Sequence, residues 1–298
     1  MNKEAKGTIF AIIAAVISGI SIPINKIFVV SLDPMAFTAI RSLIIGIIFF
    51  ILIKLKKENF KIKLNAKYLA LIAIIGGAFA FLLFFTGLKL TTAGRGAFLH
   101  KTLPIFVVIF AFIFLKEKIN KKHLYSILIM FLGIFIIYYS DIVPTQLWSN
   151  PSLGDLLVIG ATVLWALENV IARKVMIKNG GNFIVSFFRM FFGGIIILAF
   201  VLLMGRTEVL VSLNAQQLIN ISISTAILFG YVFFWYWSIK LINVSKASIL
   251  LLLSPVISLL LGIIIFNEPV PATQLIGSAL ILIGAYLVSN VKSELQNI

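Results

Sequence analysis

Ten separate runs of mostly apolar residues dominate this chain, and each is long enough to cross a lipid bilayer. A membrane-spanning helix needs about 20 such residues. Only helices and closed barrels satisfy their backbone hydrogen bonds inside lipid, and runs of this length favour helices. The chain is therefore predicted to be an all-α polytopic membrane protein with ten transmembrane helices, at residues 7–30, 34–53, 68–88, 94–115, 121–140, 153–175, 183–204, 217–239, 246–266 and 272–290.

Composition argues against the other classes. The chain is 61% apolar and only 12% charged, which is too apolar for a soluble domain. Its net charge of +15 would suggest nucleic-acid binding in a soluble protein, but most of the basic residues lie in short gaps between the apolar runs. We therefore expect a lipid bilayer and a small-molecule substrate as partners, and no nucleic acid. The chain has no cysteine, which excludes disulfides and thiolate metal sites.

The first apolar run follows a basic start, as in a signal peptide. It is longer than the apolar core of a typical signal peptide. Further spans follow it. We expect this run to remain as the first transmembrane helix.

The segment KLTTAGRGAFLHKTLPIFVVIFAFIFLKE, residues 89–117, returns in a degraded form at residues 240–268. A constant offset of 151 residues places Lys89 on Lys240, Arg95 on Lys246, Pro104 on Pro255 and Glu117 on Glu268. Upstream, an offset of 148 residues places Arg41 on Arg189 and Gly46 on Gly194. The pattern predicts two five-helix units, residues 1–140 and 153–298, joined by a loop at 141–152.

The distribution of basic residues predicts the orientation of both units. With the N-terminus inside, the inner segments hold 18 lysines and arginines and the outer segments hold four. Both termini are then cytoplasmic, in a protein of the cell membrane. Five spans is an odd number, so the second unit enters the membrane upside down. The sequence therefore predicts a 5+5 inverted repeat, which in secondary transporters places a substrate site between the halves.

The segment LTTAGRGAFLHKTLPIFVVIFAFIFLKEKI, its second copy and the paired Arg41 and Arg189 resemble the EamA family of the drug/metabolite transporter superfamily. The resemblance covers both halves. It implies a ten-helix fold and the export or exchange of small metabolites by alternating access, and the best-known relatives move amino acids. The first span of the family often has a Trp-Gly pair where this chain has Ser18 and Gly19.

Glu168 is the only carboxylate well inside a predicted span. Trp165, Glu168 and Asn169 are spaced i, i+3, i+4 and so share one helix face. A charge at the centre of a membrane helix costs about 2.5 to 3.5 kcal/mol on insertion scales, so it usually faces the interior of the bundle. We expect this face to line a central cavity, with Glu168 as a proton acceptor or a counter-ion for a substrate ammonium. The alternative is a structural ion pair with Lys101 or another basic residue.

Lys101 follows His100 near the start of the fourth predicted span. It is a candidate for binding a substrate carboxylate, with His100 as a titrating neighbour. The alternatives are a lysine whose ammonium reaches the outer membrane interface and a histidine that only packs.

Pro104 and Pro255 lie inside apolar runs, where proline removes a helix hydrogen bond and bends the helix. They are candidate hinges, or fixed bends that shape the bundle. Glu117 and Glu268 end their spans on opposite faces of the membrane and are candidate gates, or partners of nearby basic groups.

Two corresponding spans, the third and the eighth, are rich in aromatic residues. Phe81 and Phe85 share a face of one, and Tyr231 and Trp235 share a face of the other. Such a wall suits a partly apolar amine or amino acid through packing and cation–π contacts. The alternative is that these rings face lipid. Arg41 and Arg189 are expected to bind other parts of the bundle rather than substrate.

These observations predict a secondary transporter for small amphipathic metabolites, with amino acids or related amines as substrates and with proton coupling left open. The alternative is a permease for anionic metabolites or nucleotide-sugars. An intramembrane enzyme or a scaffold is a weaker alternative, because no cluster of catalytic residues is present at one depth. No P-loop or metal motif occurs, so we expect no cofactor and no enzyme activity. Ten spans could suffice as a monomer, and a homodimer is the alternative.

Overall fold

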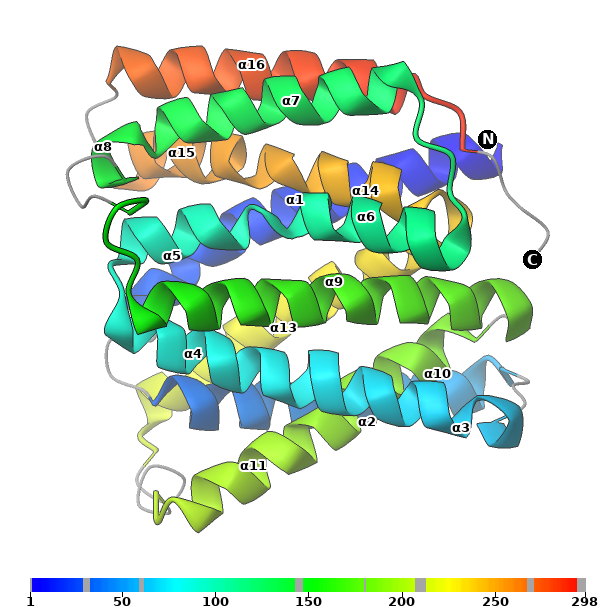
Figure 1. The fold of residues 1–298 in the computed structure, drawn as a ribbon. Coiled ribbons are helices and arrows are strands. Elements are labelled where there is room, and N and C mark those ends of the chain that lie inside the picture. Colours follow the sequence, from blue (N-terminus) through cyan, green and yellow to red (C-terminus); the bar gives the residue numbers. More distant parts are fainter. Residues whose placement is uncertain are drawn as a thin grey trace.

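The structure, a computed structural model, describes residues 2–28, 33–58, 62–142, 147–179, 181–206, 213–266 and 271–293. Within these residues the chain forms helices and no strands (Figure 1). The elements are α1 (Lys3–Phe28), α2 (Pro34–Leu55), α3 (Ile62–Leu71), η2 (Ile72–Phe79), α4 (Ala80–Leu90), α5 (Ala93–His100), α6 (Leu103–Leu115), α7 (Lys121–Ile137), α8 (Tyr139–Ile142), α9 (Leu153–Asn179), α10 (Asn182–Phe187), η3 (Phe188–Phe192), α11 (Gly193–Leu203), α13 (Ala215–Leu241), α14 (Val244–Leu250), η4 (Leu251–Leu253), α15 (Ser254–Phe266) and α16 (Ala272–Ser289).

The described residues contain nine helical spans that are long and apolar enough to cross a membrane. Helix α7 stands at the remaining predicted position. Its 17 residues match the lower end of the length that spans the hydrocarbon core. The predicted all-α fold with helices at all ten positions is thereby confirmed.

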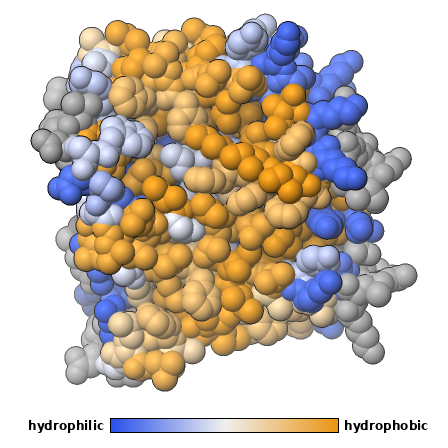
Figure 2. Space-filling model, in the orientation of Figure 1, coloured by the Kyte–Doolittle hydropathy of each residue, from blue (hydrophilic) through white to orange (hydrophobic). Residues whose placement is uncertain are grey.

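An apolar band runs across the molecule between hydrophilic edges (Figure 2). On α7, for example, Leu124, Leu128 and Leu132 are each more than half exposed and recur every fourth residue along one face. Lipid rather than water suits such a face. The start of α1 lies at the same edge of the bundle as the end of α16 (Figure 1).

Local sequence signals account for several helix starts. Asp33 caps α2, because its carboxylate accepts hydrogen bonds from the backbone N–H groups of Met35 and Ala36 at 2.9 and 3.0 Å. Pro34 follows at the first helical position, where a missing N–H has no cost. At the start of α13, Asn214 and Gln217 form a reciprocal capping box.

The spans predicted at 94–115 and 246–266 are broken rather than continuous. The first divides into α5 and α6 at Lys101 and Thr102, and the second divides into α14 and α15 through the short 3₁₀ turn η4. Pro104 and Pro255 each lie at the second residue of the helix that follows the break. The prediction of a bent but continuous helix was therefore wrong in detail, because each proline starts a new helix.

Two spans contain π-helical segments, η2 and η3, which the sequence analysis did not predict. These segments pack against each other. A Cβ atom added at Gly77 in η2 would collide with the backbone oxygen of Arg189 in η3. Glycine is needed here because the two backbones approach too closely for a side chain.

Candidate functional site

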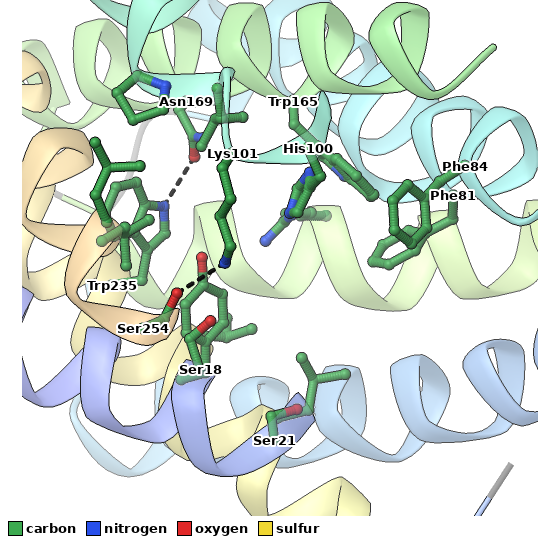
Figure 3. Close-up of a pocket in the computed structure, with 18 of the residues that line it drawn as sticks. Ser18, Ser21, Phe81, Phe84, His100, Lys101, Trp165, Asn169, Trp235 and Ser254 are labelled. Carbon is green, nitrogen blue, oxygen red and sulfur yellow. Dashed lines mark hydrogen bonds between the residues drawn. The ribbon is translucent and has the colours of Figure 1, made fainter. Parts of the chain in front are cut away.

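A cavity of about 250 Å³ lies between the breaks of the two divided spans (Figure 3). Residues at and directly after each break line it, including Lys101 and Pro104 in one span and Leu252 and Ser254 in the other. Helices α1, α4, α9 and α13 and the segment η3 complete the wall. The cavity is therefore built from both halves of the chain.

Lys101 is a buried cation at this cavity. Its Nζ donates a hydrogen bond to Ser254 Oγ at 2.8 Å (Figure 3). No Asp or Glu among the described residues lines the cavity, and the described ion pairs do not include Lys101. A lysine ammonium has three donor hydrogens, so Lys101 keeps donors for a ligand.

Aromatic rings form the other side of the cavity. The Trp165 ring contacts three of the others. Its centroid lies 5.1 Å from that of Phe81, 5.3 Å from that of Phe84 and 5.1 Å from that of His100 (Figure 3). These separations are typical of favourable aromatic contacts. The cavity thus combines a cationic end with an apolar, aromatic end.

Hydrogen bonds fix the orientation of two tryptophans. Trp165 Nε1 donates to the backbone oxygen of Gly76 at 3.1 Å. Trp235 Nε1 donates to Asn169 Oδ1 at 2.8 Å (Figure 3), and its ring stacks on Tyr231 with an interplanar angle of 5°. Because both indole N–H groups are satisfied, the rings present their faces rather than a free donor.

Glu168 is fully buried and is not among the residues that line the cavity. Its Oε1 accepts a hydrogen bond from Tyr236 at 2.5 Å, and its Oε2 lies 3.6 Å from Nε of Arg189. Arg189 does line the cavity. A Cβ atom at Gly76 would collide with the Glu168 side chain, so this glycine leaves the space that the carboxylate occupies.

The structure gathers most of the predicted site residues around one cavity. Those that line it are Lys101, His100, Phe81, Phe85, Trp165, Asn169, Tyr231, Trp235 and Pro104. Glu168 contacts the wall from behind through Arg189, and Pro255 follows the lining residue Ser254. The interfacial alternative for Lys101 was wrong, since its side chain is buried at the cavity.

Glu117 lies away from the cavity and caps helix α14. Its Oε1 accepts a hydrogen bond from the backbone N–H of Val244 at 2.9 Å, and its Oε2 accepts two from Ser245, at 3.1 Å from the backbone and 2.6 Å from the hydroxyl. A carboxylate at a helix N-terminus is stabilising. Its predicted counterpart Glu268 lies outside the described residues.

Arg41 joins three helices, as expected for a structural arginine. Its NH1 donates to Ser224 Oγ at 2.7 Å, and Ser224 donates to Asn25 Oδ1 at 2.6 Å. Its guanidinium also stacks on Phe37, with CZ 3.9 Å from the ring centroid.

Among the lining residues that sequence reasoning did not assign to the site, two bear on its chemistry, Arg189 and Ser254. Arg189 was assigned a structural role because its repeat partner Arg41 is equally placed in its own span, yet only Arg189 reaches the cavity. Ser254 was one hydroxyl among several in its span. Its position directly before Pro255, at the break, was the signal that could have singled it out.

The EamA-like transporter family matches this chain over residues 5–139 and residues 152–290. A solved crystal structure aligns with 95% of this chain and 98% of its own length at a TM-score of 0.77 and 16% sequence identity. That likeness shows the fold alone.

Curated relatives include several that are described as uncharacterized transporters. One from Archaeoglobus fulgidus is 30% identical over 91% of this chain and 94% of its own. YyaM of Bacillus subtilis is 29% identical over 78% of this chain and 75% of its own, and one from Methanothermobacter thermautotrophicus is 26% identical over 95% and 85%. The helical fold, the apolar spans and the family match over nearly the whole length together show that this chain is a multi-pass membrane transporter of the EamA-like transporter family.

Proposed function

We propose that the protein is a secondary transporter that exports or exchanges small amphipathic metabolites, amino acids foremost, by alternating access. The observation that carries the proposal is Lys101, a buried ammonium without a described carboxylate partner, facing an aromatic wall in one cavity. A buried charge is costly unless it is paired. A substrate carboxylate would supply the missing partner, and the rings would receive its apolar part.

The charge of the cavity favours a substrate that carries a carboxylate over a simple amine. Arg189 is already paired with Glu168, so the lining keeps the uncompensated charge of Lys101. An amino-acid ammonium would then be received by aromatic faces such as Trp165 rather than by a carboxylate. A substrate that is bound through its carboxylate shares this contact with the anionic metabolites of the alternative proposal.

The size of the cavity separates small acids from nucleotide-sugars. A volume of about 250 Å³ is below the range of roughly 300 to 1,000 Å³ that is typical of sites for drug-sized ligands. A small monocarboxylate or amino acid suits this volume better than a nucleotide-sugar. Small anionic metabolites are the second candidate, because Lys101 would bind their anionic group in the same way.

Proton coupling is assigned to Glu168. Its carboxylate lies between Tyr236, which donates to Oε1, and Arg189, which lies near Oε2 and reaches the cavity. Oε2 has no hydrogen-bond partner among the described residues. Protonation of this carboxylate would release Arg189 toward the cavity, which links proton uptake to the charge that the substrate meets.

A two-unit organisation with opposite orientations completes the proposal. Reciprocal packing supports it: a Cβ atom at Gly46 would meet the backbone of Phe191, and one at Gly194 would meet the backbone of Leu43. The 148-residue offset relates Gly46 to Gly194 and Leu43 to Phe191, so the second contact is the repeat-related copy of the first. The two segments matched by the family also support two units, and the excess of lysine at the N-terminal face supports cytoplasmic termini.

The test is uptake of a labelled pool of all common amino acids into proteoliposomes, with and without an imposed pH gradient. We expect saturable uptake that grows with the gradient and is absent from protein-free liposomes. Competition with matched analogues then assigns the recognised group: for leucine, 4-methylpentanoate lacks the ammonium and 3-methylbutylamine lacks the carboxylate. The acid should compete and the amine should not. Lack of uptake by folded protein, or competition by the amine alone, would overturn the proposal.

A further inference from the structure

Two buried or partly buried ion pairs occupy equivalent places in the two halves of the chain. Arg95 on α5 pairs with Asp155 at the start of α9, and Lys246 on α14 pairs with Glu4 at the start of α1, with Nζ 2.6 Å from Oε1. Lys246 follows Arg95, and Asp155 follows Glu4, by the same 151 residues. The sequence repeat relates Arg95 to Lys246, but only the structure shows which carboxylate each of them contacts.

The two pairs lie at opposite faces of the bundle. Figure 1 shows α5 beside the start of α9 at one face, and α14 beside the start of α1 at the other. Each pair therefore joins a short helix of one half of the chain to the first long helix of the other half. No other described ion pair has a counterpart of this kind.

Each basic residue sits on a short helix that leads to the cavity. Helix α5 carries Arg95 and ends at His100, beside Lys101, while α14 carries Lys246 and runs into the lining residue Leu251. Both short helices end at a break, where the chain can change direction without breaking a continuous helix. A tilt of α5 or α14 about its break would separate its ion pair and uncover the cavity from that face.

The environment of the pairs suits contacts that form and separate. Asp155 also accepts hydrogen bonds from the backbone N–H of Ser152 at 2.7 Å and from Thr91 Oγ1 at 2.5 Å, so its charge keeps partners if Arg95 leaves. Glu4 likewise keeps Ser293, whose hydroxyl donates to it at 3.1 Å. A buried ion pair brings little net stability, because desolvation offsets most of its attraction. Separating a buried pair is costly when it leaves a charge without partners. Here the basic groups keep partners too: Arg95 NH2 donates to the backbone oxygen of Asn150 at 3.1 Å, and Lys246 Nζ donates to those of Ser289 and Val291 at 2.9 and 2.7 Å.

We propose that Arg95–Asp155 and Lys246–Glu4 are the two gates of the transport cavity, one at each face, and that transport requires them to open in alternation. Both are closed in this structure. The gates replace Glu117 in the gating role that its sequence position suggested, since Glu117 holds the N-terminus of α14 in place. This inference rests on the proposed alternating access, but its test measures access to the cavity and needs no substrate.

The chain has no cysteine, so one introduced thiol reports access without a background. Ser18 lines the cavity and suits the replacement Ser18→Cys. The rate of its reaction with a membrane-impermeant thiol reagent is measured in vesicles, separately from each face. Asp155→Asn should raise the rate about tenfold from the face of Asp155 and lower it from the other, and Glu4→Gln should do the reverse.

Two further variants make the test decisive. The double variant Glu4→Gln with Asp155→Asn weakens both gates, so the ratio of the two rates should return toward that of the parent. The control is Asp33→Asn, which removes the ion pair between Asp33 and Arg206, whose atoms lie 2.9 Å apart. This pair lies at the same face as Asp155 but contacts neither α5 nor α14. The variant should therefore leave both rates unchanged. Unchanged rates in both gate variants, equal rises from both faces, or an equal effect of Asp33→Asn would overturn the proposal. Lack of amino-acid uptake by the parent protein, with these rate changes intact in the variants, would count against the proposed substrate instead.

Discussion

Lys101 Nζ donates a hydrogen bond to Ser254 Oγ at 2.8 Å, and this contact joins the breaks of two spans that lie 153 residues apart in the chain. Each residue stands where its span changes from one helix to the next. The bond spans the cavity wall between the two breaks. A substrate carboxylate bound by the remaining donors of Lys101 would attract the ammonium and draw it away from Ser254, which would loosen the link between the two broken spans.

Replacement of Lys101 tests the anion site directly. We expect Lys101→Met to raise the KM for a carboxylate substrate about 10- to 100-fold, because a hydrogen bond to a charged group contributes about 1.5 to 3 kcal/mol. Lys101→Arg should retain part of the affinity because it keeps the charge. The control is Lys122→Gln, which removes an exposed lysine far from the cavity. An unchanged KM in Lys101→Met would contradict the assignment.

Removal of the Ser254 hydroxyl should have the opposite effect. In Ser254→Ala the ammonium loses its described partner, so binding of a carboxylate no longer breaks a hydrogen bond. A hydrogen bond to a charged group contributes about 1.5 to 3 kcal/mol, and we therefore expect the KM to fall about tenfold or more. Ser258→Ala is the matched control, because Ser258 lies one turn further on α15 and its hydroxyl donates to the backbone oxygen of Gly19. A higher KM in Ser254→Ala would mean that the hydroxyl binds substrate itself.

Glu168→Gln separates proton coupling from substrate binding. The neutral amide cannot take up and release a proton, so uptake should stop responding to an imposed pH gradient while exchange of internal for external substrate continues. Tyr236→Phe removes the hydrogen bond to Oε1 but keeps the carboxylate, and its uptake should still respond to the gradient. Unchanged gradient-driven uptake in folded Glu168→Gln would exclude Glu168 as the coupling residue.

The packing of α7 on α16 depends on glycine at position 277. A Cβ atom there would lie 2.5 Å from the backbone oxygen of Gly133, so Gly277→Ala must push the two helices apart. We expect it to destabilise the protein by about 1 to 3 kcal/mol, the usual cost of overpacking a well-packed contact. Gly160→Ala is the control, since its Cβ would meet only Leu83, at 3.6 Å. Thermal unfolding in detergent measures both, and equal melting temperatures would contradict the prediction.

Helices at all ten predicted positions were recovered from the sequence because lipid imposes a simple requirement. Each span must be apolar over a fixed length, and the composition of residues 34–55 or 94–115 meets it without reference to any neighbour. Most of the cavity was also predicted, since Trp165 and Asn169 share a helix face and Tyr231 and Trp235 share another. Helix periodicity is a local property.

Contacts between spans were beyond such reasoning. The sequence placed Glu168 on the face of Trp165 and Asn169, but the direction of its side chain depends on Arg189 and Tyr236, which come from two other spans. The π-helical segments η2 and η3 likewise arise where two spans press together at Gly77, and no single segment encodes that approach.

The sequence by itself determined the class of protein, the positions of its spans and the chemical types of residue that face inward, because those follow from hydrophobic length and helical period. The tertiary structure alone decided which charge stays free and which is paired. Lys101 and Arg189 are both cations within apolar runs, yet among the described residues only Arg189 forms an ion pair with a carboxylate. That difference comes from the packing of spans that are distant in the chain, and it is the basis of the proposed anion site.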